Sequence, residues 1–210
     1  MDAGYQTAAR EAEDAFVERR SRFIGAICPV QTEEDALAFV AKRKKAHWDA
    51  THHVYAYVLR QGGIRRYSDD GEPQGTAGIP MLEVFRRAGV TNVVCVVTRY
   101  FGGILLGTGG LVRAYTQGAQ VAVAAAGVQR MSLYTVALIA CPYNLYDIVT
   151  HLLPEYDCAV EETDYGADVT LTVTLPAGGE DRLNAGLAEA TAGTVYAEVM
   201  ETKFMGRRVK

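Results

Sequence analysis

The chain has 210 residues, of which 49% are hydrophobic and 22% are charged, and its formal net charge at pH 7 is −4. This composition is typical of globular proteins and excludes a disordered or fibrous chain. No apolar run approaches the roughly 18 residues of a membrane span. The acidic start differs from a signal peptide, so we expect a cytoplasmic protein without a membrane partner. The four cysteines form no CxxC pair, which indicates reduced thiols.

Charge divides the chain near Arg130. Residues 1–130 carry 16 Lys and Arg against 13 Asp and Glu, whereas residues 131–202 carry one basic residue against twelve acidic ones. Such an acidic segment repels a polyphosphate. We therefore expect two domains, residues 1–130 and 131–210, with any nucleic-acid contact in the first domain or in the short basic tail that ends the second.

Strand and helix patterns alternate in the first domain. Residues 15–30 alternate apolar and polar side chains, which predicts one or two strands. Thr32, followed by three acidic residues, caps a predicted helix whose inner face includes Leu37, Val40 and the stem of Lys44. Residues 52–59 and 64–68 flank a glycine-containing turn, which is typical of a hairpin.

Two glycine-rich loops separate the next predicted elements. Pro80 suits the first turn of a short helix, and Gly89 suits its end. The β-branched run at residues 93–97 predicts a strand buried on both faces. A helix over about residues 111–126 carries a stripe of small residues that allows close approach to the sheet: Ala114, Gly118, Ala122 and Ala126.

The second domain has the predicted element order βαββαβ, which is the ferredoxin-like signature. The predicted segments are strand 133–140, helix 144–153, strands 158–162 and 168–175, helix 180–190 and strand 194–202.

The chain lacks residues that known nucleotide-binding and hydrolase motifs require. Gly102 and Gly107 have the spacing of a P-loop, but Thr108 stands where lysine is required. Val112 stands where a dinucleotide fingerprint needs glycine. The chain also lacks GxSxG and HExxH motifs, so a hydrolase interpretation has no nucleophile. We expect no cofactor.

Arg113 lies in the first turn of the predicted helix, where the helix dipole disfavours a cation. An anion is therefore expected beside it. One candidate is a carboxylate from Asp69, Asp70 or Glu72. The other is a bound phosphate or partner carboxylate that Arg113 shares with Arg99.

Three carboxylates lie within four residues, at Asp69, Asp70 and Glu72. Such a group can hold a hard cation or serve in acid/base chemistry, but Asp and Gly clusters are also typical of turns and helix caps. The adjacent His52 and His53 point to opposite faces of a strand, so they do not readily bind one ion. We expect no metal site.

Aromatic residues and arginines are interleaved around the two glycine-rich loops, as in Arg66-Tyr67 and Arg99-Tyr100-Phe101. Exposed, these side chains suit base stacking or a protein-binding hot spot. The alternative is that the aromatic rings belong to the core and the arginines are their solvated neighbours.

The segments RRYSDDGEPQGTAGIPML and VVTRYFGGILLGTGGLVRAYTQGA, together with SRFIGAICPV and DATHHVYAYV, resemble the YigZ/IMPACT family over almost the whole chain. The resemblance implies an α+β fold of two domains: an N-terminal α/β domain of ribosomal-protein domain-2-like type, and a C-terminal ferredoxin-like βαββαβ domain similar to domain V of elongation factor G. It also implies a link to translation, which eukaryotic members regulate. It implies no catalytic residues. The candidate binding residues in the two motifs are Arg66, Asp69, Asp70, Glu72, Thr76, Arg99, Tyr100, Phe101, Arg113 and Tyr115.

Two functional hypotheses follow from the residues and the resemblance. The first is a non-enzymatic binding protein whose N-terminal domain contacts RNA, the ribosome or a translation-related protein. The second is an enzyme that acts on a phosphorylated or nucleotide-like small molecule at the DDGEP and RYFGG loops. A narrow pocket between these loops favours the enzyme, and a broad basic face favours the binding protein. The oligomeric state stays open.

Overall fold

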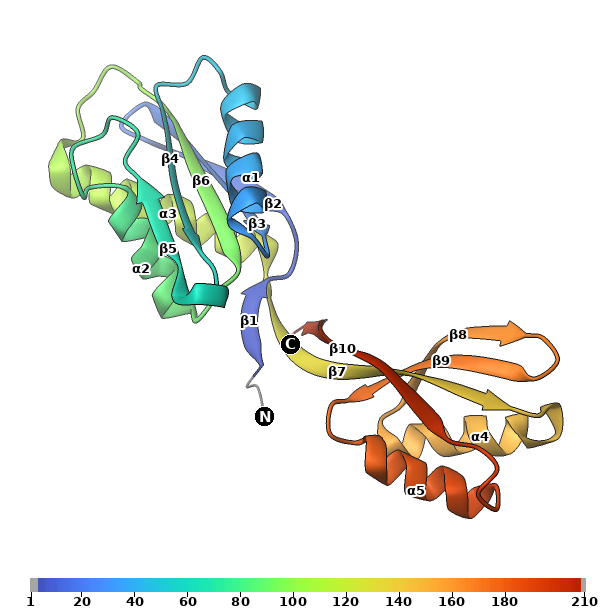
Figure 1. Ribbon diagram of the computed structural model, residues 1–210. Coiled ribbons are helices and arrows are strands. Elements are labelled where there is room, and N and C mark those ends of the chain that lie inside the picture. Colours follow the sequence, from blue (N-terminus) through green and yellow to red (C-terminus); the bar gives the residue numbers. More distant parts are fainter. Residues whose placement is uncertain (1–3, 209–210) are drawn as a thin grey trace. The chain divides into compact units, whose positions relative to one another are not determined.

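The computed structural model describes residues 4–208 and divides into two compact units, whose main segments are Tyr5–Arg130 and Met131–Gly206 (Figure 1). Each unit combines helices with its own sheet, so the fold is α+β with two domains, as predicted. Among residues 4–208, no helix has both the length and the apolar composition needed to cross a bilayer. The four cysteines are free, and three of them are buried.

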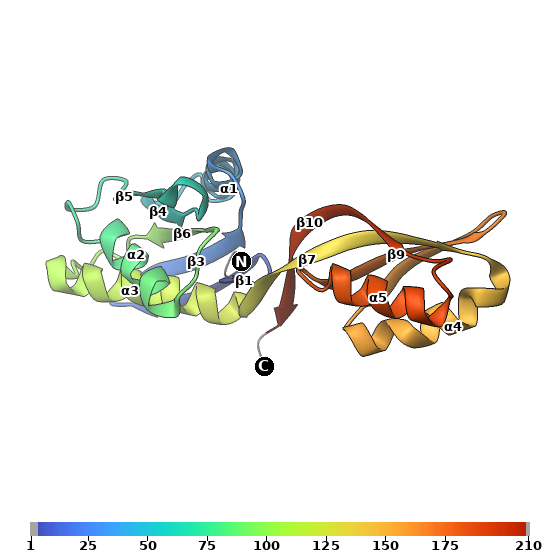
Figure 2. The ribbon, with the colours of Figure 1, turned by 60° about the horizontal axis from the view of Figure 1, so that its bottom comes forward.

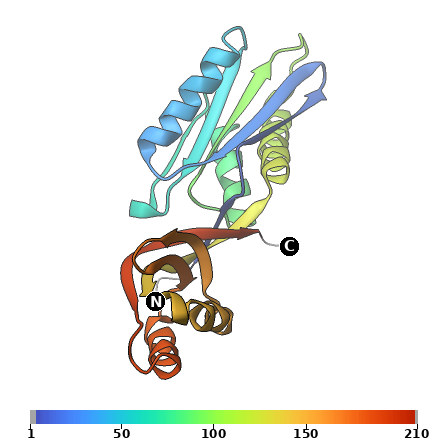
Figure 3. The ribbon, with the colours of Figure 1, turned by 90° about the vertical axis from the view of Figure 1, so that its right-hand side faces the viewer.

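The first unit contains β1 (Tyr5–Ala8), β2 (Ala12–Glu18), β3 (Ser21–Pro29), α1 (Glu33–Ala46), β4 (His52–Val58), η1 (Gln61–Gly63), β5 (Arg65–Ser68), α2 (Gly78–Ala88), β6 (Val93–Tyr100) and α3 (Gly107–Ala126). Its main sheet has the order β2-β3-β6-β4-β5, with antiparallel neighbours. Helix α1 covers one face of this sheet, and α2 and α3 cover the other (Figures 1 and 3). Strand β1 was not predicted.

Strand β6 is the central strand of this sheet, and both of its faces are buried. Val94 and Val96 pack in the cluster under α1, whereas Cys95 and Val97 pack under α2 and α3. The continuous β-branched run therefore marks a doubly covered strand, as expected.

Helix α1 begins with the expected cap. The Thr32 hydroxyl accepts the amide of Asp35, and the Asp35 carboxylate accepts the amide of Thr32, which completes a capping box. The expectation for Leu37 is wrong, since this residue is 46% exposed. Lys44 is exposed as well, whereas Val40 is buried as predicted. The other buried residues of α1 are Ala36, Phe39 and Arg43.

Helix α3 starts at Gly107, four residues before the predicted start. Arg113 therefore lies in the second turn, not the first, and the expected conflict with the helix dipole is weaker. Glycine has a low helix propensity, which hides this turn in the sequence. The buried side chains of Leu106 and Leu111 hold it against the core.

The second unit contains β7 (Val128–Cys141), η2 (Tyr143–Leu145), α4 (Tyr146–Leu152), η3 (Leu153–Tyr156), β8 (Ala159–Tyr165), β9 (Val169–Pro176), α5 (Glu180–Ala190) and β10 (Ala197–Arg208). Strands β7, β9 and β8 are neighbours in that order, and β7 also pairs with β10. The order β10-β7-β9-β8 is that of a ferredoxin-like sheet, and α4 and α5 lie together on one side of it (Figure 2). The backbone of the predicted tail belongs to β10 as far as Arg208, and Lys210 lies outside the described residues.

Candidate functional site

Four connections meet at one end of the first sheet. Register places Arg22 opposite Tyr100, and His52 opposite Arg99, so the starts of β3 and β4 lie beside the end of β6. We call this region the loop end; it consists of residues 19–20, 47–51, 69–77 and 101–106. Both glycine-rich motifs contribute to it.

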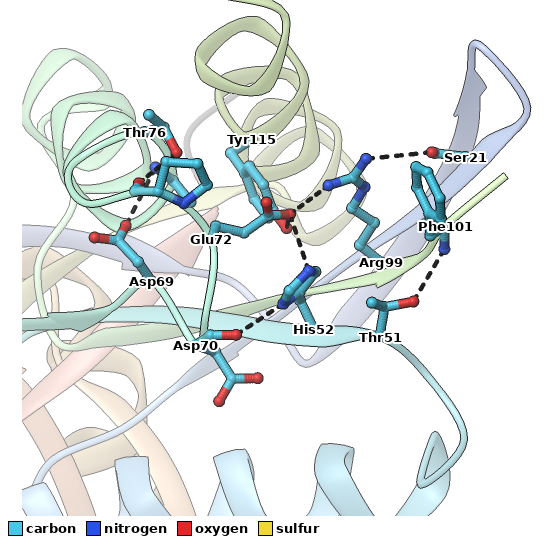
Figure 4. A network of polar contacts seen from close by, with 12 residues as sticks. Ser21, Thr51, His52, Asp69, Asp70, Glu72, Thr76, Arg99, Phe101 and Tyr115 are labelled. Carbon is cyan, nitrogen blue, oxygen red and sulfur yellow. Dashed lines mark hydrogen bonds and ion pairs between the residues drawn. The ribbon is translucent and has the colours of Figure 1, made fainter. Parts of the chain in front are cut away.

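A buried carboxylate, Glu72, lies at the centre of the loop end (Figure 4). Its Oε1 accepts hydrogen bonds from Arg99 Nη1 at 2.6 Å and from the Tyr115 hydroxyl at 2.7 Å. His52 Nε2 lies 3.7 Å from the same oxygen. The side chains of Glu72 and Arg99 are only 4% and 6% exposed, so this ion pair is shielded from water.

Burial and the hydrogen bond to Glu72 raise the pKa of the Tyr115 hydroxyl well above its usual value. Tyr115 therefore stays protonated and remains a donor to the carboxylate at any physiological pH.

Arg99 is enclosed by further contacts. Its Nη2 lies 3.5 Å from the Ser21 hydroxyl, and its guanidinium stands 5.5 Å from the ring of Phe23 and 5.4 Å from the ring of Phe101. Thr51 accepts the backbone amide of Phe101 at 3.2 Å, which anchors the start of the β6–α3 loop. Arg99 is thus a structural cation and not an exposed one.

Asp69 supports the start of α2. Its carboxylate accepts the amides of Gly75, Ala77 and Gly78 at 2.8, 3.2 and 2.8 Å. Three donors that the helix and its preceding turn leave open are satisfied in this way. Asp69 is therefore occupied by the backbone.

Asp70 points to α1 instead. It accepts the amide of His53 at 2.6 Å and the ammonium of Lys44 at 3.0 Å. Burial alone raises the pKa of Asp70, but these two donors outweigh it and lower the pKa below its usual value. The three clustered carboxylates have separate partners, and among residues 4–208 no group of three or more His, Cys, Asp and Glu side chains is arranged to hold a metal ion.

A cleft of about 410 Å³ opens between the two motif loops. We call it the apolar cleft because Pro73, Phe101, Leu105, Leu106 and Leu111 form most of its wall. Its polar lining comes from Thr51, His52, Glu72, Arg99 and Thr108.

Three other predicted residues lie away from this cluster. The Thr76 hydroxyl donates to the Pro73 carbonyl at 2.6 Å and stabilises its own loop. Arg66 is exposed on β5. Tyr100 faces α1, because successive residues of β6 alternate, and its hydroxyl donates to Asp49 at 3.0 Å.

Arg113 does not meet the carboxylates expected for it, and it does not share an environment with Arg99. It is exposed on α3 and lines a hollow of about 140 Å³ with Glu18, Arg19 and Gln117. Within residues 4–208, it forms no ion pair with Asp69, Asp70 or Glu72, and the buried Arg99 belongs to a different environment.

The binding residues predicted from the sequence do not include several residues in or beside the loop end. His52 borders the apolar cleft, and its position two residues before the buried Val54 places it on the same face of β4 as the core side chains. Trp48 and Leu105 are 83% and 80% exposed. Their exposure has no sequence signal, since both residue types are usually buried.

Two family descriptions match the chain in order. The Impact N-terminal domain matches residues 19–123, and a domain of unknown function, DUF1949, matches residues 139–194. The first match contains the apolar cleft and both motif loops.

Bacterial relatives align along most of the chain. IMPACT family member YvyE of Bacillus subtilis is 36% identical over 206 residues, which cover 98% of this chain and 95% of that protein. IMPACT family member YigZ of Escherichia coli is 39% identical over 186 residues, which cover 87% of this chain and 91% of that protein.

A mammalian relative aligns along less than half of the chain. Protein IMPACT of Mus musculus is 38% identical over 98 residues, which cover 44% of this chain and 30% of that protein.

A solved structure also matches. The crystal structure of a hypothetical protein is 36% identical to this chain, with a TM-score of 0.63, and the match covers 96% of this chain and 99% of the other. The likeness therefore extends through both units.

Proposed function

Because this chain belongs to the IMPACT family, we propose that it is a cytoplasmic binding protein that works in translation or its regulation, and that the loop end of the first unit contacts RNA on or near the ribosome. The resemblance to family members that regulate translation supports the biological setting. The physical support comes from the exposed side chains of the loop end.

The observation that carries this proposal is a mixed basic and apolar surface. Trp48, Phe101 and Leu105 are 83%, 45% and 80% exposed there. Basic side chains that are also exposed in or beside the loop end are Arg19, Arg20, Arg22 and Arg113. Single-stranded nucleic acids are bound by this combination, in which cations track the phosphates and flat apolar side chains stack on bases.

Charge supports assigning RNA contact to the first unit. Residues 131–202 contain one basic and twelve acidic residues, so this segment disfavours a polyanion. A role for the second unit in binding a protein is consistent with that charge.

The test compares two triple variants with equal changes in charge. Arg19→Gln, Arg20→Gln and Arg113→Gln remove cations from the loop end. The control triple makes the same change to glutamine at three arginines that are exposed outside the loop end: Arg65, Arg86 and Arg87. Single-stranded RNA affinity is measured over a range of salt concentrations, and ribosome association is measured in lysate pull-downs.

We expect the loop-end triple to weaken RNA binding and to reduce the slope of log K against log salt by about 2, because each phosphate contact on a single strand contributes about 0.7. The control triple should retain the native slope. Equal effects of the two triples would reject the loop end as the RNA surface.

A second candidate function is an enzyme acting on a phosphorylated or nucleotide-like small molecule. The observation that favours it is the apolar cleft of about 410 Å³ between the DDGEP and RYFGG loops, with His52 at its edge. The ion pair with Glu72 opposes it, because Arg99 has no free charge for a phosphate. Thermal stabilisation by nucleoside or sugar phosphates that disappears in His52→Ala would favour the enzyme.

A further inference from the structure

Two hollows within the first unit share one lining residue. Leu106 lines both the apolar cleft and the hollow of about 140 Å³ that contains Arg19 and Arg113. Arg19 also reaches across the boundary, since its Nη1 donates to the carbonyl of Leu105 at 3.5 Å. An apolar compartment therefore lies directly beside a compartment with two guanidinium groups.

The apolar cleft suits an uncharged flat group. Its one cation, Arg99, is paired with Glu72 at 2.6 Å, so the floor offers no uncompensated charge to a phosphate. Phe101 is 45% exposed, and Leu105 extends the apolar wall. Hydrogen-bonding groups at the edge of a bound ring come from Thr51, His52 and Thr108.

The neighbouring hollow suits an anion. Arg19 and Arg113, which line this hollow, are both exposed, and Glu18 contributes the one carboxylate of the lining. Guanidinium groups bind phosphate oxygens through paired N–H donors. The two arginines together outweigh the single carboxylate.

From this juxtaposition we infer that the loop end binds one unstacked RNA nucleotide, with the base in the apolar cleft against Phe101 and the adjoining phosphate beside Arg19 and Arg113. This inference rests on the proposed RNA-binding function and specifies its recognition unit. It predicts that affinity depends on the bases themselves and not only on the phosphate backbone.

The experiment uses the full chain with an eight-nucleotide oligouridylate and with an abasic ribose-phosphate chain of equal length. The cleft variant carries Phe101→Ala and Leu105→Ala. The control variant carries Leu37→Ala and Ile79→Ala, two residues that are 46% and 48% exposed outside the cleft. Circular dichroism verifies the folding of both variants.

We expect the native protein and the control variant to bind the oligouridylate about tenfold more tightly than the abasic chain, because stacking of one base on an aromatic side chain is worth about that factor. The cleft variant should bind both chains with equal, weak affinity. In the native protein, photo-crosslinking from 5-iodouridine should label the peptide that contains Phe101, a readout that does not depend on the variants.

Four outcomes overturn the inference. If the native protein binds both chains equally, the base does not enter the cleft and the proposed function stands. The same holds if RNA binding persists but crosslinks map outside the residues that line the cleft, which lie within 51–52, 72–73 and 99–111. If the cleft variant retains native RNA affinity, the cleft serves another occupant, such as an apolar side chain of a protein. If no RNA binds at all, the proposed function fails as well.

Discussion

Glu72 and Arg99 come from the two different glycine-rich motifs, yet their side chains form an ion pair in the interior of the protein. Each buried charge is tolerated because the other compensates it and Tyr115 supplies a further hydrogen bond. Arg99 therefore cannot be removed as a test of RNA binding without disturbing the fold. Phe101, whose ring contacts the Arg99 guanidinium and lines the same cleft, is exposed and suits that purpose.

The buried pair leads to a stability prediction. Glu72→Gln keeps the shape of the side chain but leaves Arg99 charged and uncompensated, so we expect a loss of about 3 kcal/mol in the free energy of unfolding. Tyr115→Phe leaves the ion pair intact and should cost about 1 kcal/mol. Urea unfolding measures both. Glu83→Gln, on the exposed surface of α2, is the control and should change little; equal losses for Glu72→Gln and Glu83→Gln would contradict the assignment.

Asp70 leads to a prediction about acid stability. Its pKa in the folded protein lies below the unfolded value of about 3.9. Its contribution is therefore complete above about pH 4 and is lost as the pH falls through the folded pKa. We expect Asp70→Asn to lower the melting temperature at pH 7, and the difference from the native protein to shrink towards pH 2. A difference that is constant over this pH range would show that the carboxylate charge is not responsible.

At the scale of elements, the close approach of α3 to the sheet positions the loop end. A Cβ atom built at Gly25 of β3 would lie 2.0 Å from the backbone oxygen of Gly118 in α3. The stripe of small residues therefore allows the backbone of α3 to pack directly against the backbone of β3. This contact sets where α3 begins relative to β6, and hence where the β6–α3 loop runs.

Substitution of Gly25 tests this contact. Gly25→Ala forces two backbones apart, and we expect a loss of about 3 kcal/mol, at the upper end of typical overpacking costs. Gly109→Ala in the first turn of α3 is the matched control, because its Cβ would meet only the Arg113 guanidinium at 3.9 Å. That change should leave stability equal or raise it by about 0.5 kcal/mol. Thermal unfolding distinguishes the two, and similar melting temperatures would contradict the close packing.

At the scale of the whole molecule, each unit buries its own hydrophobic side chains. The first unit has clusters on both faces of its sheet, and the second has one cluster between its sheet and the helices α4 and α5. A core defect in one unit should therefore act mainly within that unit.

Leu171→Ala tests this independence. Leu171 is fully buried in β9, and its truncation should destabilise the second unit by about 3 kcal/mol. We expect amide hydrogen exchange to accelerate in β9 and β8 while the amides of β6 keep their native rates. Acceleration of the same size in β6 would mean that the two units unfold together.

The sequence by itself determined most of the secondary structure and the two-domain α+β class. Strong local signals account for this: the doubly buried run at 93–97, the cap at Thr32, the left-handed cap at Gly89 and the βαββαβ order of the second half. Each of these depends on side-chain periodicity or on backbone conformation over a few residues, which the sequence expresses directly.

Only the tertiary structure decided which motif residues meet. Asp69, Asp70 and Glu72 are close in sequence, yet they face the start of α2, the helix α1 and the buried Arg99, respectively. One of the two interpretations of Arg113 was an anion shared with Arg99, but Arg99 is buried and Arg113 is exposed. The physical reason is that side chains along a strand point to alternate faces, and that a loop changes direction several times within about ten residues. The partners of a side chain are therefore set by packing between distant segments and not by spacing along the chain.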